Sequence, residues 1–195
     1  MKKFLPLLLI IGILVLAGFY MMNLNNRLVK LDESASAQWA NVESSYQRRG
    51  DLIPNIVNTA KGYAEFEQET LIKVTEARSK ATSITIDPSN ITPEQLQQFQ
   101  QAQSGLTSAL SRLLAVFERY PDLKANENFK ELINELERTE NRINVERNRF
   151  NDEARVFNTE IKQFPATLFA GILGFDAKAY FEAEAGNENA PVVEF

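Results

Sequence analysis

An uncharged apolar run near the N-terminus places the strongest constraint on how this chain can fold. Residues Phe4–Met22 (FLPLLLIIGILVLAGFYMM) follow one another for 19 positions without a charged side chain. At 1.5 Å per residue, a helix of this length reaches about 28 Å, close to the bilayer hydrocarbon thickness of about 30 Å. The sequence therefore predicts a transmembrane anchor over residues 1–23. Representative positions along the predicted span are Phe4, Leu9, Leu14, Phe19 and Met22.

A cleaved signal peptide is the alternative interpretation of the same run. Lys2 and Lys3 supply a basic start, but the run exceeds the apolar core of about 7–15 residues that signal peptides use, and no A-x-A-like site follows it. A retained anchor is favoured, which makes the chain a single-pass protein of the cell (inner) membrane. Basic residues nearly balance across the run, because Arg27 and Lys30 follow it. The rest of the chain is expected on the extracytoplasmic side, with the opposite orientation left open.

The composition excludes several classes of function. The 195 residues contain no cysteine and no histidine, which excludes disulfide frameworks, thiol nucleophiles, Ser-His-Asp triads and histidine-containing metal motifs. The net charge of −5 argues against nucleic acid as a partner, since nucleic-acid-binding surfaces are basic. We therefore predict no catalytic residue, no cofactor, no metal and no nucleic-acid partner.

Apolar residues after the run recur every three or four positions, which is the pattern of amphipathic helices. Proline and glycine divide the pattern into four long helices, predicted over residues 24–49, 52–82, 93–120 and 124–162. The predicted fold class is all-α, with an N-terminal transmembrane helix followed by an antiparallel four-helix bundle over residues 24–163.

Two boundaries of these helices have specific signals. Gly50–Asp51 predicts a stop and a new start, and a continuous helix through Pro54 is the alternative. Thr92 before Pro93 has the sequence of an N-cap. No break separates the apolar run from the first predicted helix, so the two can form one rod.

The residues that follow the fourth predicted helix break the helical pattern. They divide into a short aromatic segment, residues 164–184, and a flexible tail, residues 185–195. In an up-down-up-down bundle the last helix returns toward the membrane, so this segment would arrive near the lipid surface. It is too short to span the bilayer, and it either lies in the membrane interface or caps the open end of the bundle. Its candidate interfacial residues are Phe164, Leu168, Phe169, Ile172 and Phe175.

Polar residues interrupt three of the apolar stripes, at Glu67, Gln103, Glu140 and Arg147. Because a buried charge is costly unless it is paired, we predict a polar core network that fixes helix register, with Glu67 or Glu140 paired to Arg147. Exposure of these residues at the surface is the alternative. A carboxylate metal site is disfavoured, since such bundle sites normally include histidine.

Two further stretches are considered as interaction surfaces, and only the first is kept as a candidate. The stretch 95–111 has no charge, so the face that carries Gln97 and Gln101 is a candidate surface for another protein or protomer. A Gln-rich face in solvent is the alternative. The stretch RRGDLIPN (Arg48–Asn55) is interpreted as a structural turn, in which arginine complements a helix C-terminus, rather than as a docking site for an acidic partner.

Several stretches together resemble the LemA family of bacterial membrane-anchored proteins. They are NRLVKLDESASAQWANVESSYQRRGDLIPNIVNTAKGYAEFE, VTEAR at 74–78, LLAVFERYPDLKANENF, ELERTENRINVERNRFNDEARVFN and FPATLFAGILGFDAKAYFEA. The resemblance covers nearly the whole chain in the right order. It implies an N-terminal transmembrane helix, a helical bundle and no established catalytic activity, and one branch of the family is associated with magnetosome membranes.

The sequence thus predicts a membrane-anchored, non-enzymatic interaction or scaffold protein. Its expected partners are the lipid bilayer, through the N-terminal helix, and other membrane or envelope proteins, with a homo-oligomer left open. A membrane-shaping or envelope-organising role is the alternative. A carboxylate-based envelope hydrolase is disfavoured, because it would need two acids about 5–10 Å apart in one cleft.

Overall fold

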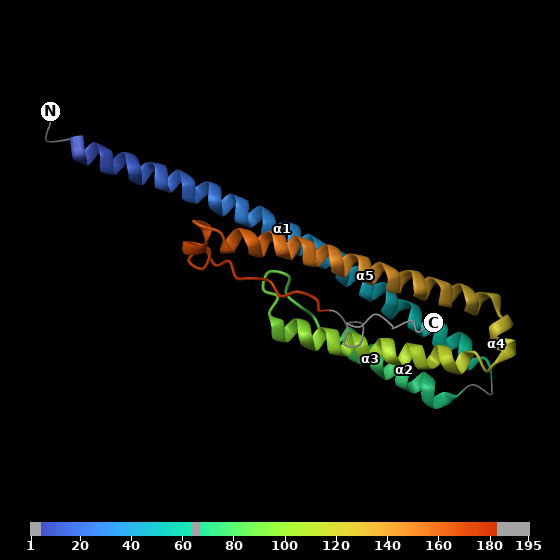
Figure 1. Cartoon of the computed structure of the whole chain (residues 1–195). Coiled ribbons are helices and arrows are strands. Elements are labelled where there is room, and N and C mark those ends of the chain that lie inside the picture. Colours follow the sequence, from blue (N-terminus) through green and yellow to red (C-terminus); the bar gives the residue numbers. More distant parts are fainter. Residues whose placement is uncertain (1–4, 64–66, 183–195) are drawn as a thin grey trace, which may run out of the picture.

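The computed structural model describes residues 5–63 and 67–182 (Figure 1). Within this part the all-α fold is confirmed, since it contains helices and no strand. The elements in order are α1 (Leu5–Lys61), α2 (Gln68–Thr82), α3 (Pro93–Phe117), α4 (Pro121–Ala125), α5 (Glu127–Lys162) and the short 3-10 helix η2 (Ala166–Leu168). In the bundle, α1 packs along α5, and α2 packs against both α3 and α1. Phe4 and the predicted tail 185–195 lie outside the described residues.

Helix α1 is one continuous rod of 57 residues, which corresponds to about 86 Å. The prediction that the apolar run and the first bundle helix are one rod is therefore confirmed. Its N-terminal part projects beyond the bundle (Figure 1) and exposes its apolar side chains, from Leu9 to Phe19. Within the described residues, α1 is the one helix long and apolar enough to cross a membrane. From Leu24 onward its stripe is buried in the bundle.

The predicted stop at Gly50–Asp51 is wrong, because α1 continues through Pro54. Proline has no N–H to donate to the carbonyl four residues earlier, which here belongs to Gly50. Arg78 on α2 supplies the missing donor, with its Nε 2.6 Å from the Gly50 carbonyl oxygen. The helices predicted over 24–49 and 52–82 are therefore replaced by α1 and by the shorter α2, with the break after Lys61.

The later boundaries agree better with the sequence. Thr92 caps α3 as predicted, since its side chain accepts from the backbone N–H of Gln95 and a full capping box is present. Helix α3 ends at Phe117 rather than at residue 120. The predicted helix 124–162 corresponds to α5, which begins at Glu127 because Asn126 acts as its N-cap and accepts from the backbone N–H of Phe129. The separate short helix α4 precedes it.

The core consists of three clusters arranged along the bundle. The middle cluster is aromatic and surrounds Trp39, whose ring stacks on Phe181 at 5.7 Å and meets Phe150 edge-on at 5.3 Å. Phe181 lies in residues 176–182, the C-terminal segment, which therefore completes the core. Such aromatic pairs stabilise a fold beyond their buried area.

Polar contacts along the seam fix the antiparallel register of α1 and α5. Arg27 lies 2.7 Å from Glu160, and Ser34 donates to Glu153 at 2.8 Å. At the other end of the seam, Arg48 pairs with Glu135 at 2.6 Å. This register brings the end of α5 back beside the point where α1 leaves the bundle.

Candidate interaction surfaces

A groove of about 1110 Å³ separates α3 from α5. These two helices make little direct contact, whereas the other long neighbours pack closely. The groove is lined by both helices, by residues of α1 at its floor, and by Phe181 and Glu182 at one end. One seam of the bundle is therefore open to solvent.

Arg49 forms the polar centre of this floor. Its side chain is only 1% exposed, and its Nη1 lies 2.6 Å from Glu140 Oε1 and 2.9 Å from Thr107 Oγ1. Its Nη2 donates to Gln103 Oε1 at 2.6 Å, and Gln103 Nε2 donates in turn to the carbonyl of Ala81 at 3.1 Å. One buried guanidinium thus joins side chains of α1, α3 and α5 and, through Gln103, the end of α2.

The predicted polar network is only partly assembled. Gln103 and Glu140 are brought together, but their shared partner is Arg49 and not Arg147. Glu67 lies elsewhere, as the N-cap residue of α2, and pairs with Arg119 at 2.8 Å. The interpretation of Arg48–Asn55 as a helix end is wrong, because these residues lie inside α1.

Arg147 instead contacts the C-terminal segment. Its Nη2 donates to the carbonyl of Glu182 at 2.9 Å, and its guanidinium lies over the Phe181 ring at 4.9 Å from the centroid. The pairing of Arg147 with Glu67 or Glu140 is therefore replaced by a contact that holds the segment at the mouth of the groove.

Uncharged hydrogen-bonding side chains line both walls of the groove. On α3 they recur every three or four residues, at Gln97, Gln100, Ser104, Thr107 and Ser111, and on α5 at Asn141, Asn144, Asn148 and Asn151. Gln101, the second residue of the predicted interaction face, also lines the groove. Within the described residues, Gln97, Gln101, Asn144 and Asn148 make no hydrogen bond, so their amides face the groove with unused capacity.

Two asparagines of α5 show how this helix holds a non-helical segment. Asn158 donates from Nδ2 to the carbonyl of Lys178 and accepts from its N–H, both at 2.8 Å. Asn151 makes the same pair of bonds with the backbone of Phe181, at 2.9 and 2.8 Å. The Lys178 ammonium is buried and lies 2.7 Å from Asp32 of α1. The segment is thus fastened to both α5 and α1.

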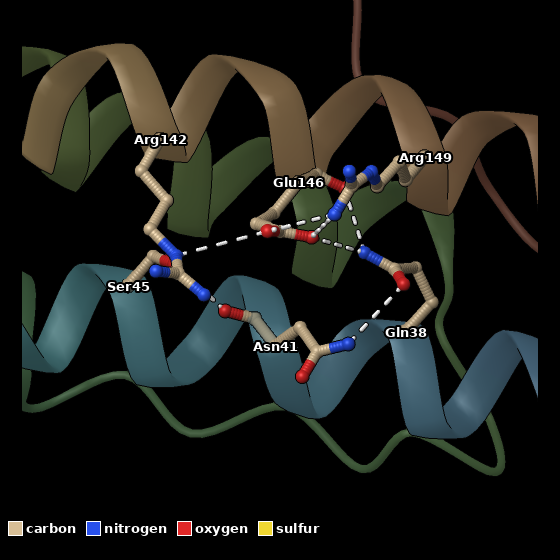
Figure 2. A network of polar contacts seen from close by, with 6 residues as sticks. All are labelled: Gln38, Asn41, Ser45, Arg142, Glu146 and Arg149. Atoms are coloured by element: carbon tan, nitrogen blue, oxygen red, sulfur yellow. Dashed lines mark hydrogen bonds and ion pairs between the residues drawn. The ribbon is translucent and has the colours of Figure 1, made fainter.

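A buried carboxylate that the sequence analysis missed lies on the other side of α5 (Figure 2). Glu146 is 4% exposed, and its Oε2 accepts from Gln38 Nε2 at 2.7 Å. Arg149 Nη1 lies 3.2 Å from Glu146 Oε1, and Arg142 Nε lies 3.7 Å from the same oxygen. Two arginines and an amide compensate the charge of this carboxylate, so we interpret Glu146 as a residue that stabilises the fold.

The segment after α5, residues 164–175, covers the end of the bundle from which α1 emerges. Ala166 and Ala170 are buried against Leu24 and Leu28 of α1, with Phe169, Leu173 and Phe175 packed at the edge of the same cluster. The inner face of this segment therefore packs as expected for a segment that caps the end of the bundle. Its outer face is apolar and open, since Phe164, Leu168 and Ile172 are 80%, 58% and 81% exposed.

In the part of the chain that the structure describes, no group of three or more acidic side chains could hold a metal ion. Three acids line the groove, Glu137, Glu140 and Glu182, of which Glu137 and Glu140 lie one turn apart on α5 and Glu140 is paired to Arg49. The walls of the groove offer hydrogen-bonding surface to a partner.

Comparison with known proteins agrees with the resemblance seen in the sequence. The model of the LemA family matches residues 38–195. Magnetosome protein MamQ 2 of Paramagnetospirillum magneticum is 26% identical over 205 residues, covering 95% of this chain and 75% of that protein. Magnetosome protein MamQ of Magnetospirillum gryphiswaldense is 28% identical, covering 93% and 74%. Protein LemA of Metamycoplasma hominis is 28% identical over 142 residues, covering 73% and 61%.

Proposed function

Because this chain belongs to the LemA family, we propose that it is a membrane-anchored, non-enzymatic interaction protein that presents its α3–α5 groove to a partner protein. The anchor is the exposed apolar part of α1. The bundle is expected on the extracytoplasmic side of the cell membrane. The observation that carries the proposal is the open groove, whose two walls display unused amides and hydroxyls.

The occupant that fits this groove is an extended, largely uncharged segment of another membrane or envelope protein. Helix α5 already holds one non-helical segment, through Asn151 and Asn158. Asn144 lies seven residues before Asn151, which is the spacing between the two asparagines that are engaged. The same side-chain type therefore continues along the helix in the same register, with its amide unused. An amide that both donates and accepts satisfies one backbone N–H and one C=O.

Charge supports the choice of a partner that is neither strongly acidic nor strongly basic. Between Gln97 and Ser111 the α3 wall has no charged residue, and Asn141, Asn144 and Asn148 are neutral on the opposite wall. Charged residues also line the groove, but Glu140 is paired to Arg49 and Arg147 contacts Phe181 and Glu182. A highly charged segment would therefore lose hydration on entering and gain few ion pairs. An uncharged polar segment exchanges its hydrogen bonds with water for those of the walls.

Site-specific photocrosslinking in intact membranes tests this proposal. Benzoylphenylalanine at Gln97, which lines the groove, is compared with the same group at Gln98, which is exposed but does not line it. We expect a covalent product with another protein from position 97 and much less from position 98. Mapping of the crosslinked peptide should find a segment with few charged residues, and Asn144→Lys together with Asn148→Lys should abolish the product. Equal yields at both positions, or products formed only within the chain itself, would contradict the proposal.

The proposed orientation has its own test, because a chain without cysteine accepts single labelled positions cleanly. Ile72→Cys on α2 is 49% exposed in the native side chain. A membrane-impermeant maleimide should label it in intact spheroplasts to the same extent as in lysed ones. Labelling only after lysis would place the bundle in the cytoplasm.

A further inference from the structure

We propose that residues 164–175, the cap, form a second membrane contact, with the outer face seated in the interfacial layer of the same bilayer that α1 crosses. The side chains that would enter the lipid are Phe164, Leu168 and Ile172. This inference rests on the proposed anchoring by α1, and it adds a contact that would fix the orientation of the bundle on the membrane.

The position of the cap along α1 is the first argument. Leu24, which shares a core cluster with Ala166 and Ala170 of the cap, lies two residues beyond Met22, the end of the apolar run. Two residues of helix correspond to about 3 Å, so the cap lies at the level where α1 leaves the hydrocarbon layer. Figure 1 shows the cap at this end of the bundle, beside α1.

The second argument is the division of the cap into two apolar faces. A segment that only closed the bundle would bury its large side chains and expose its small ones. Here Ala166 and Ala170 face inward, with Phe169, Leu173 and Phe175 partly buried beside them, whereas Phe164 and Ile172 are 80% and 81% exposed. Leu168 lies midway between those two in the sequence and is also exposed. These three exposed apolar side chains lie beside the part of α1 that is proposed to enter the bilayer, where the interfacial layer would bury their apolar surface.

The third argument is chemical. The cap has no charged residue between Phe164 and Phe175, and the chain beyond the apolar run has 26 acidic residues against 19 basic ones. Attraction to anionic headgroups is therefore a weak contribution, and the contact must be hydrophobic and insensitive to salt. A weak contact is sufficient to keep the cap in the interfacial layer. Because α1 already holds the cap at the bilayer, its insertion is an intramolecular step at high effective concentration.

Continuity with α1 favours the bilayer over a second copy of the chain as the occupant. The exposed side chains of α1, such as Leu16 at 70%, require lipid, and the cap adjoins the end of that surface. Lipid that surrounds the span therefore reaches the cap without any rearrangement of the bundle.

Nitroxide accessibility in the full-length chain tests the inference. Single cysteines replace Leu168, Ile172, Leu16 on α1 and Val145 on α5, each exposed, so a label should not disturb packing. Val145 is a matched exposed apolar control, about 24 Å along α5 from Ile161. Each protein is reconstituted into phosphatidylcholine vesicles, and collision rates with oxygen and with a water-soluble nickel chelate are measured at low and high salt.

We expect the oxygen-to-nickel ratio at Leu168→Cys and Ile172→Cys to approach that at Leu16→Cys, to exceed that at Val145→Cys, and to be unchanged by salt. A ratio at Ile172→Cys equal to that at Val145→Cys, with a lipid-like ratio at Leu16→Cys, would overturn this inference alone. Low collision with both reagents, together with spin–spin broadening between labels, would identify a second copy as the occupant and would also overturn it. A water-like ratio at Leu16→Cys would overturn the anchoring itself.

Discussion

Asn151 and Asn158 hold the C-terminal segment in one register along α5. They are seven helical residues apart, a rise of about 10.5 Å. The backbone groups that they bind, at Phe181 and Lys178, are three residues apart, and three extended residues span about 10 Å. Helix and segment therefore match in length, and each asparagine can satisfy both backbone groups of its partner.

Replacing Asn158 by alanine should weaken the fold. The change removes two hydrogen bonds and leaves the buried backbone N–H and C=O of Lys178 without their partner. We expect a loss of about 1–3 kcal/mol in the free energy of unfolding, measured by urea denaturation. Asn148→Ala on the same helix is the control, with a change within about 0.5 kcal/mol, because Asn148 is exposed.

Replacing Glu140 by alanine should also destabilise the bundle. Arg49 would keep a buried charge without its carboxylate, but Glu140 is one-third exposed, so water relieves part of the penalty. We expect a loss of about 1–3 kcal/mol, and a smaller loss for Glu140→Gln, which can still accept a hydrogen bond. Glu137→Ala, one turn away and exposed, should have little effect. Full retention of thermal stability by Glu140→Ala would contradict the role assigned to Arg49.

A double-mutant cycle can test the role of Arg78 at the proline in α1. Arg78→Ala alone should cost about 1–2 kcal/mol, because the carbonyl of Gly50 loses its donor. In a Pro54→Ala background the restored N–H can bond to that carbonyl, so the same substitution should cost less. Equal costs in both backgrounds would show that Arg78 acts through its other contact, with Asp51 at 4.0 Å.

Phe181→Ala should open the aromatic cluster around the single tryptophan. The Trp39 ring would lose its stacked partner, and the free energy of unfolding should fall by about 3–5 kcal/mol. Tryptophan emission should shift to longer wavelength as water reaches Trp39. Tyr180→Ala, next in sequence but 42% exposed, should leave the emission unchanged.

The sequence was sufficient for the elements whose causes are local. The apolar stripe from Leu24 to Tyr46 is buried as its spacing predicts, apart from a partly buried Leu31, and the capping box at Thr92 forms as written. The stop predicted at Gly50 is wrong because Arg78 replaces the hydrogen-bond donor that Pro54 lacks. Arg78 lies in a different helix, 28 residues from the Gly50 carbonyl that it binds. A local pattern contains no signal for a donor that arrives through tertiary packing.

Because of the wrong boundary at Gly50, the sequence pattern did not predict that Arg49 would be buried at the centre of the candidate site. If the stripe of α1 is continued past Tyr46 at the same spacing, the next core positions are Arg49 and Ile53, so a charged residue takes a core place. In a continuous helix, the spacing therefore predicts a buried Arg49. Glu67 looked like an interruption for the same reason, since it precedes α2 instead of lying within a helix.

The burial of Glu146 and Asn158 had only an ambiguous signal in the sequence. Glu146 lies three residues after Ile143 and four before Phe150, a spacing that fits the apolar stripe as well as that of Arg147 does. Their burial depends on Gln38 of α1 and on the returning C-terminal segment, which are remote in sequence. Only the assembled tertiary structure places these partners beside them.

Helix α1 is continuous, so it connects the proposed membrane span rigidly to the far end of the bundle. From Met22 to Lys61 the helix extends about 59 Å without a joint. A tilt of about 10°, of the size that helices adopt to match bilayer thickness, displaces the tip by about 10 Å. With α1 as the proposed anchor, the tilt of the span would therefore set the direction of the groove, and the proposed contact of the cap with the bilayer would limit that tilt.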